Sequence, residues 1–313
     1  MTATTLFYII IAILILSFII DKILDTLNSS HYNDPIPVEL KDVYDHKEYQ
    51  KSQAYKKVND RFGSITSLVS LVATLAFFFL DGFAFVDKWA RTFSDNNIIV
   101  ALIFFGSIML ASDILSTPFS YFHTFVIEER FEFNKTTIKT FFLDKAKGWL
   151  ISSLLGGLIL SIIIWFYEST GSNFWLYAWG MVAAFAFFMN MFYARLIVPL
   201  FNKQTPLEEG TLKAKIENYA QQVGFKLDKI FVIDGSKRST KANAYFSGFG
   251  NEKRVTLYDT LINDLEEDEI VAVLAHEVGH YKRKHIVFNL IASILTMGFT
   301  FWLLSLFVGS PIL

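Results

Sequence analysis

The sequence has 313 residues, of which 53% are hydrophobic and 33 are phenylalanine, and its mean hydropathy is positive. This is more apolar side chain than a water-soluble domain needs for one core, so the composition indicates a membrane protein. The net charge of -2 argues against a nucleic-acid partner, for which a clustered basic surface is expected, and the absence of cysteine excludes disulfides and thiolate metal ligands.

Six apolar stretches are each long enough to cross the hydrocarbon core of a bilayer as a helix, which takes about 20 residues. They are residues 3–20, 63–86, 97–118, 149–167, 174–198 and 286–308. The first is predicted to be a retained span and not a cleaved signal, because no basic residue precedes it and charged residues follow it directly. The predicted fold class is therefore a mainly α-helical, polytopic membrane protein.

Lys and Arg alternate between the connections that join these spans. Their numbers are 7 in residues 21–61, 2 in the next connection, 5 in 130–147, none in 168–172 and 14 in 195–284. Cytoplasmic loops carry the excess of positive charge. The alternation predicts an external N-terminus and cytosolic loops at 21–61 and 119–147, with the long polar segment 203–283 also in the cytosol.

Residues 203–285 have the composition of a small soluble α+β segment, between an N-terminal transmembrane region at 1–202 and a sixth span at 286–313. Thr205 and the proline after it predict a helix start, and the helix is expected to end near Gly224. Three stretches rich in β-branched and aromatic residues predict strands at 229–234, 243–247 and 254–258. A second helix is predicted to begin in the acidic run 266–269.

This second helix carries His276-Glu277-Val278-Gly279-His280, which has the spacing of a zinc-protease motif. Histidines four residues apart lie about 40° apart around a helix, so His276 and His280 can direct two imidazoles at one ion. A zinc ion would acidify a water molecule and polarise a scissile carbonyl, and Glu277 would take the proton as general base. The alternative is a solvated polar face of a helix.

His285 is not expected to be a third ligand. It follows His280 by five residues, about 140° around a continuous helix, and so faces elsewhere. With the basic run 282–284 it is predicted to form a cationic collar where the helix enters the lipid headgroups. The sixth span, from Ile286, is expected to continue the same helix, which puts the zinc site roughly 9 Å from the bilayer.

A catalytic zinc takes three protein ligands and keeps an open position for water. No Asp or Glu follows Glu277, and the upstream carboxylates, such as Asp259 or Glu252, have no spacing argument in their favour. The sequence is therefore expected to be a C-terminally truncated piece of a longer protein, with the third ligand beyond its end.

Five further motifs accompany the zinc motif. They are EYQKSQAYKKVNDRFG at 48–63, TFVIEERFEFNKTT at 124–137, PLFNKQTPLEEGTL at 199–212, DGSKRSTKANAYFSGFG at 234–250 and LYDTL at 257–261. In these motifs, their order and their spacing, the sequence resembles the type I CAAX prenyl proteases, membrane-embedded zinc metallopeptidases that trim prenylated C-terminal peptides. The resemblance extends over most of residues 40–285.

The resemblance implies a barrel of seven transmembrane helices, six of them present, around a water-filled chamber, with a small cytosolic α+β zinc-protease segment. His276 and His280 match the family's ligands for one Zn²⁺ per chain, and Glu277 matches its catalytic glutamate. A third ligand, a seventh span and a histidine that assists at the oxyanion would lie beyond the chain end. Asn243 and Ala244 match the substrate-binding edge strand, where free backbone groups hold an extended peptide; the alternative is an ordinary hairpin strand.

Ionisable and strongly polar residues in or near the apolar stretches indicate a polar interior, since such groups are costly in lipid unless they pair or face water. They are Asp113, Glu128, Glu129, Arg130, Asn190 and Arg195.

The predicted function is hydrolysis of peptide bonds near the C-terminus of prenylated, CaaX-type, or other membrane-tethered proteins. The expected partners are a lipidated or membrane-tethered peptide or protein and the lipid bilayer. One alternative is a heat-shock-type quality-control zinc protease, which has fewer spans before its zinc motif than the five found here. The other is a catalytically incomplete membrane protein that binds peptides. The zinc site is expected on the cytosolic side of a bacterial inner membrane, or of the endoplasmic reticulum and nuclear envelope in a eukaryote.

Overall fold

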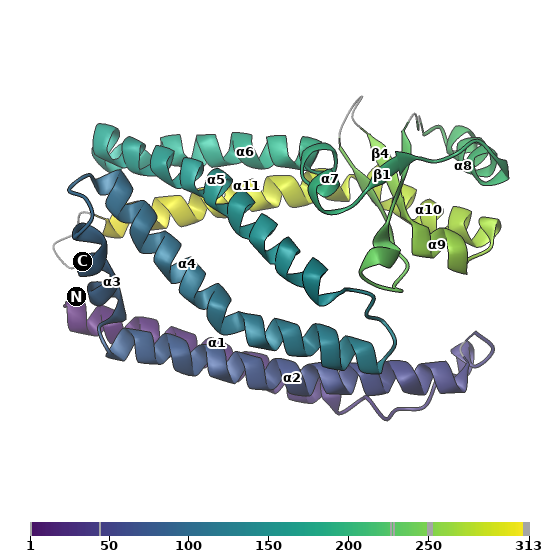
Figure 1. Cartoon of the computed structure of the whole chain (residues 1–313), viewed down its shortest axis with the longest axis horizontal. Helices are drawn as coiled ribbons and strands as arrows, with labels where there is room; N and C mark the ends of the chain where they lie inside the picture. The colour runs from purple at the N-terminus through teal and green to yellow at the C-terminus, as the bar shows by residue number, and fades with distance from the viewer. Residues whose placement is uncertain (1, 44, 226, 228, 249–252, 309–313) are drawn as a thin grey trace. The chain divides into compact units, whose positions relative to one another are not determined.

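The computed structural model describes residues 2–43, 45–225, 227, 229–248 and 253–308. Its contacts divide the chain into two compact units, the first ending at Phe131 and the second beginning at Glu132. Figure 1 shows the order of the elements along the chain. Each unit is described by itself.

The first unit is built of long helices. They are α1 (Ala3–Ser29), α2 (His46–Phe79), the short α3 (Gly82–Arg91) and α4 (Asn97–Phe122), which continues as one π-helical segment, His123–Glu128. Neighbours in the sequence pack on one another, α1 on α2, α2 on α3 and α3 on α4 (Figure 1).

Two boundaries in this unit differ from the predicted ones. Helix α2 begins at His46, inside the predicted loop 21–61, because the Asp45 carboxylate caps it by accepting hydrogen bonds from the N–H groups of Lys47 and Glu48. The predicted span 63–86 is interrupted after Phe79 by Asp81, whose φ of 55° lies in the left-handed region. The apolar run is therefore divided between two helices.

The second unit contains the helices α5 (Ile138–Thr170), α6 (Phe174–Leu196), α7 (Val198–Phe201) and α11 (His285–Phe307). Among the described residues, five helical stretches are long and apolar enough to cross a membrane, and the stretch Ile138–Phe201 contains both the fourth and the fifth predicted spans. The chain is thus a polytopic membrane protein.

Helices α6 and α11 pack closely through a pair of residues of very different size. The indole Nε1–H of Trp179 donates to the backbone carbonyl of Ile294 at 2.8 Å. Gly298, one turn further along α11, lies directly against the Trp179 ring, where a side chain would clash. A small residue at this point lets two apolar helices approach, as is typical inside membranes.

A four-stranded sheet follows in the second unit, in the order β1-β2-β4-β3. The strands are β1 (Gln204–Pro206), β2 (Ile230–Ile233), β3 (Ala244–Ser247) and β4 (Arg254–Tyr258). Only β2 and β4 are parallel. The three predicted strands are confirmed, but the helix predicted to start at Thr205 is wrong there, because Thr205 and Pro206 lie in β1. Proline is tolerated since β1 is an edge strand.

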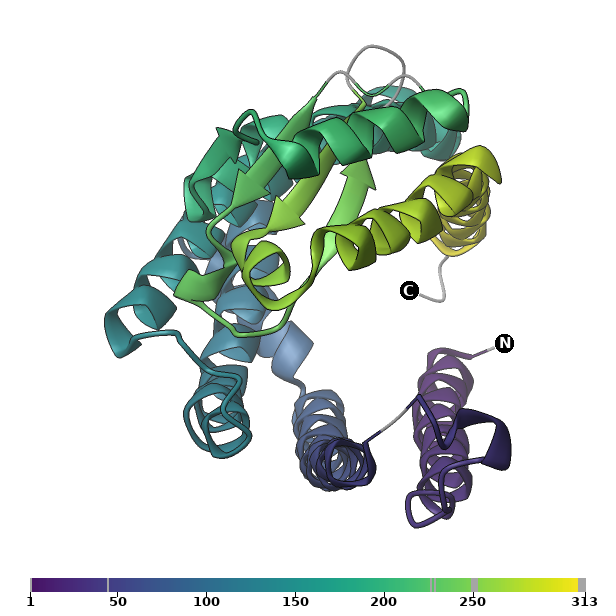
Figure 2. The ribbon, with the colours of Figure 1, turned by 90° about the vertical axis from the view of Figure 1, so that its right-hand side faces the viewer.

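Three helices cover one face of this sheet. They are α8 (Thr211–Gln222), α9 (Asp259–Asp264) and α10 (Glu267–Lys282). Figure 2 shows the green α8 and the yellow-green α10 in front of the strands. Their common core with the sheet includes the buried side chains of Ile216, Val255, Leu257, Ile270 and Leu274. This packing fixes α10, the helix of the zinc motif, on the sheet.

Candidate active site

The local sequence of α10 explains how the zinc motif is held. Glu266 and Glu269 form a capping box, and the three acidic residues of the first turn favour the positive end of the helix dipole. Ile270, Leu274 and Val278 recur every four residues and are buried. His276 and His280 occupy another face of the helix, where they are exposed.

Helix α8 is tied to the start of α10 by charged groups. Lys215 Nζ lies 2.7 Å from Asp268 Oδ1 and 3.0 Å from Glu267 Oε2. Glu267 also accepts a hydrogen bond from the Thr211 hydroxyl, and this bond, together with the one from Lys215, lowers the pKa of the Glu267 carboxyl. Because the pKa is lowered in the folded protein, these contacts stabilise the fold fully at pH values above the ordinary pKa of glutamate. The stabilisation is lost as the pH falls through the pKa of Glu267 in the folded protein.

The two motif histidines point their Nε2 atoms at each other. These atoms are 3.0 Å apart, and the ring centroids are 4.6 Å apart with the planes 77° from parallel. Two nitrogens bound tetrahedrally to one zinc at about 2.0–2.1 Å would lie roughly 3.3 Å apart. The spacing therefore fits two ligands of one zinc ion, with Glu277 next to His276 on the helix and half-buried.

The structure does not assemble a full ligand set around this pair. Within the described ranges, no cluster of three or more His, Cys, Asp or Glu side chains has the spacing of a metal site. Asp259, considered above as an upstream ligand, accepts a hydrogen bond from the Ser236 N–H at 2.8 Å. Glu252 lies outside the described residues.

His285 is found beside His280, contrary to the expectation that it faces elsewhere. The Nδ1 atoms of the two rings are 2.7 Å apart. The expectation assumed a continuous helix, but α10 ends at Lys282 and Lys284 has a φ of 57°, so that α11 starts in a new direction at His285. The three consecutive basic residues 282–284 could have indicated that a helix ends here, because basic residues are common in the last turn of a helix.

Asn243 and Ala244 lie at an edge of the sheet. Among the residues that the structure describes, β3 pairs only with β4, and the N–H of Tyr258 donates to the Asn243 carbonyl at 3.0 Å. In an antiparallel ladder the alternate residues Ala244 and Phe246 turn their backbone groups to the other side, away from β4. The Ala244 N–H donates to the Asn243 side-chain oxygen at 2.8 Å. β3 contacts α10, so this edge belongs to the element beside the zinc motif.

A polar cluster lies where α4 becomes π-helical. The Tyr55 hydroxyl donates to Glu128, and His123 Nε2 lies 2.8 Å from Asn59 Oδ1 and 3.8 Å from Glu128 Oε1. Glu128, one of the groups predicted to need a partner, therefore pairs here, as the cost of a bare charge in lipid requires.

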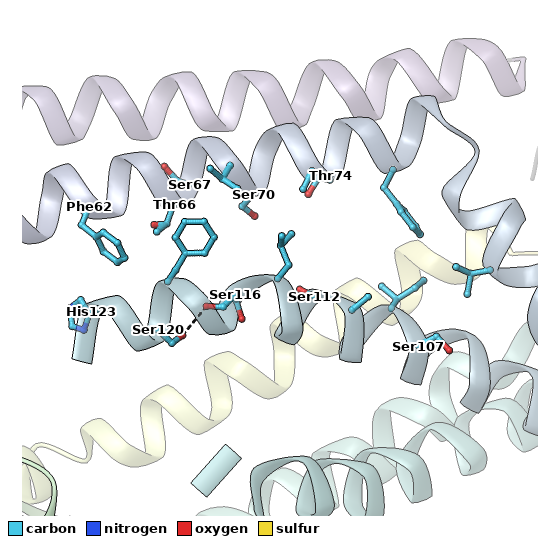
Figure 3. A pocket seen from close by; sticks show the side chains of 18 of the residues that line it. Phe62, Thr66, Ser67, Ser70, Thr74, Ser107, Ser112, Ser116, Ser120 and His123 are labelled. Atoms are coloured by element: carbon cyan, nitrogen blue, oxygen red, sulfur yellow. Dashed lines mark hydrogen bonds between the residues drawn. The ribbon is translucent and has the colours of Figure 1, made fainter. Parts of the chain in front are cut away.

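A groove of about 870 Å³ runs from this cluster between α2, α3 and α4. Hydroxyl side chains from two helices line it, among them Ser67, Ser70, Ser116 and Ser120 (Figure 3). Ser67 donates to the Ser64 carbonyl at 3.0 Å, and Ser120 donates to the Ser116 carbonyl at 3.2 Å. The hydroxyls of Ser67 and Ser120 are therefore satisfied within their own helices, which is the usual arrangement for serine in apolar surroundings.

Known protein families match nearly the whole chain. Residues 25–203 match the family described as CAAX prenyl protease N-terminal, five membrane helices, and residues 206–311 match Peptidase family M48.

Individual relatives and a solved structure are similar as well. The CAAX prenyl protease 1 homolog of Oryza sativa subsp. japonica is 38% identical over 93% of this chain and 71% of that protein. CAAX prenyl protease 1 of Saccharomyces cerevisiae is 37% identical over 88% of this chain and 62% of that protein. The crystal structure of S. mikatae Ste24p superposes with a TM-score of 0.88 at 36% identity, over 94% of this chain and 71% of that one.

Proposed function

Because the chain belongs to the CAAX prenyl protease family of M48 zinc metallopeptidases, we propose that it hydrolyses peptide bonds near the C-terminus of prenylated or otherwise membrane-tethered proteins. The observation that carries the proposal is the 3.0 Å approach of the two Nε2 atoms of His276 and His280 beside Glu277. The match to the CAAX-type membrane region over residues 25–203 favours this type over the heat-shock type.

His276 and His280 are the proposed ligands of one zinc ion, through Nε2. When bound, zinc would supply an acidified water molecule and a polarised scissile carbonyl. Glu277 would accept the proton of the attacking water as general base and deliver it to the leaving amine. A third protein ligand is required for a catalytic zinc site.

The edge of β3 is the proposed binding site for the substrate backbone. An extended peptide would add to the sheet beside Ala244 and Phe246, whose backbone groups turn away from β4. Recognition through main-chain hydrogen bonds suits a protease that accepts varied side chains. The contact of β3 with α10 supports placing the scissile bond near the histidine pair.

The substrate is proposed to arrive by way of the membrane. His280 precedes the first residue of α11, a candidate span, by only five residues. A cytosolic site is proposed from the alternation of Lys and Arg along the first four connections, which hold 7, 2, 5 and none, since short cytoplasmic loops carry the positive excess. The membrane would be the inner membrane in bacteria, or the endoplasmic reticulum and nuclear envelope in eukaryotes.

The test is to measure zinc content and cleavage of a prenylated peptide by the natural protein and its Glu277→Gln variant. We expect E277Q to keep its zinc while its kcat falls by about 100-fold or more, because the general base is lost and the ligands are not. His276→Ala is expected to lose both zinc and activity.

Asp268→Asn is the matched control, because it also removes one negative charge from α10, far from the motif and at an exposed position. It should retain activity. Full activity in E277Q would contradict the proposed role of Glu277 as general base. If the parent protein binds zinc but cleaves no peptide, the alternative of a catalytically incomplete peptide-binding protein would be favoured.

A further inference from the structure

We infer that His285 is a positioning residue that orients the zinc ligand His280 through a ring-to-ring hydrogen bond. The inference rests on the proposed function, in which His280 binds zinc. It starts from the 2.7 Å distance between the two Nδ1 atoms, which is within hydrogen-bond range.

The two nitrogens of His280 have separate partners. Nε2 faces Nε2 of His276 at 3.0 Å, and Nδ1 faces His285. If Nε2 binds the metal, the neutral ring carries its proton on Nδ1, which then donates to the unprotonated Nδ1 of His285. Histidine ligands of metals commonly donate their second N–H in this way, which fixes the tautomer and the plane of the ring.

The same geometry argues against His285 as a third ligand. Its Nδ1 contacts Nδ1 of His280, whereas Nε2 of His280 faces His276. A zinc ion held between the two Nε2 atoms would therefore have the His280 ring between itself and His285. His285 acts on the ligand and does not touch the metal.

The break between α10 and α11 makes this contact possible. Lys284 adopts a φ of 57° and a ψ of 29°, and its N–H donates to the Tyr281 carbonyl at 2.9 Å. On an uninterrupted helix, His285 would lie about 140° away from His280. Lysine rarely adopts the left-handed conformation. At this turn the conformation has a functional explanation, because it brings His285 to His280.

The experiment measures the zinc dissociation constant by chelator competition, with no hydrolysis step, in the purified natural protein and four variants. His285→Ala is expected to raise the constant about 10–100-fold, the usual cost of losing a partner of a metal ligand. His285→Asn is expected to keep most of the affinity, because its amide oxygen takes the place of the imidazole Nδ1 and can accept the same hydrogen bond. His276→Ala should abolish tight binding.

Lys284→Gly is the matched control for the turn, since glycine adopts a positive φ readily and the variant removes only the neighbouring charge. It should bind zinc as the parent does. Thermal unfolding of the zinc-free proteins checks that His285→Ala is folded. If it is not, the comparison of His285→Asn with the parent protein is the test.

Unchanged affinity in both His285 variants would overturn the positioning role and leave the proposed function standing. Two other results would also overturn that role: a loss in H285A as complete as in H276A, which would make His285 a ligand, and a His285→Asn variant that binds zinc as weakly as His285→Ala. A parent protein that binds no zinc would overturn the proposed function and this inference together.

Discussion

Arg238 joins three segments of the second unit that are far apart in the sequence. Its guanidinium makes a bidentate pair with Asp144 of α5, at 2.8 and 3.0 Å, and donates to the Phe201 carbonyl at 2.8 Å and to Asn202 at 3.1 Å. Its backbone carbonyl accepts from the Lys135 N–H at 3.0 Å. Parts of three motifs that carry the family resemblance thus meet at one residue.

We predict that Arg238→Ala lowers the free energy of unfolding by about 1.5–3 kcal/mol, because hydrogen bonds to a charged, partly buried group are lost together. Arg238 and Asp144 are only 23% and 24% exposed, so solvent screens the pair weakly. Chemical denaturation in detergent measures the effect. The free energy of unfolding of Arg238→Lys should lie between those of the parent and of Arg238→Ala, since lysine keeps the charge but cannot form the bidentate pair. Equal stability of all three proteins would contradict the prediction.

The element that most directly joins structure to function is the strand β3. It is an edge strand, it contacts the zinc-motif helix α10, and its register with β4 fixes which residues face outward. Ala244 pairs with Leu257 and Phe246 with Val255, while the Asn243 carbonyl bonds to Tyr258. A peptide added to this edge would bond at every second residue.

This register predicts an alternating effect of backbone methylation in the substrate. We expect an N-methyl group on an amide that faces β3, away from the scissile bond, to lower kcat/KM by about 3–10-fold, the cost of one hydrogen bond. N-methylation of the neighbouring amide, which points away, is the control and should have little effect. Steady-state kinetics on a series of singly methylated peptides measures this, and an effect that is the same at every position would speak against strand addition.

At the scale of the whole molecule, the chain is an integral membrane protein in which the zinc motif directly precedes a candidate span. The predicted benefit of this arrangement is access to substrates that are already bound to the bilayer. A lipid anchor concentrates a peptide at the membrane surface, and each buried methylene of the anchor contributes to this partition.

We therefore expect a prenylated peptide to be cleaved with a kcat/KM higher by on the order of tenfold or more than that of the same peptide without its lipid, with the protein in vesicles. The matched control is the same pair of peptides assayed in excess detergent, where the difference should shrink because the bilayer no longer concentrates the substrate. Equal cleavage of both peptides in vesicles would contradict delivery through the bilayer.

The sequence by itself determined the membrane class and the pair His276 and His280 with Glu277 between them. Apolar runs and the spacing of residues on one helix are local properties of the chain, so they can be recognised without knowing the fold. The tertiary structure decided what depends on distant contacts or on a single dihedral angle. Pro206 lies in a strand because β2 pairs with it. His285 reaches His280 because Lys284 adopts a left-handed conformation between two helices that were expected to be one continuous helix.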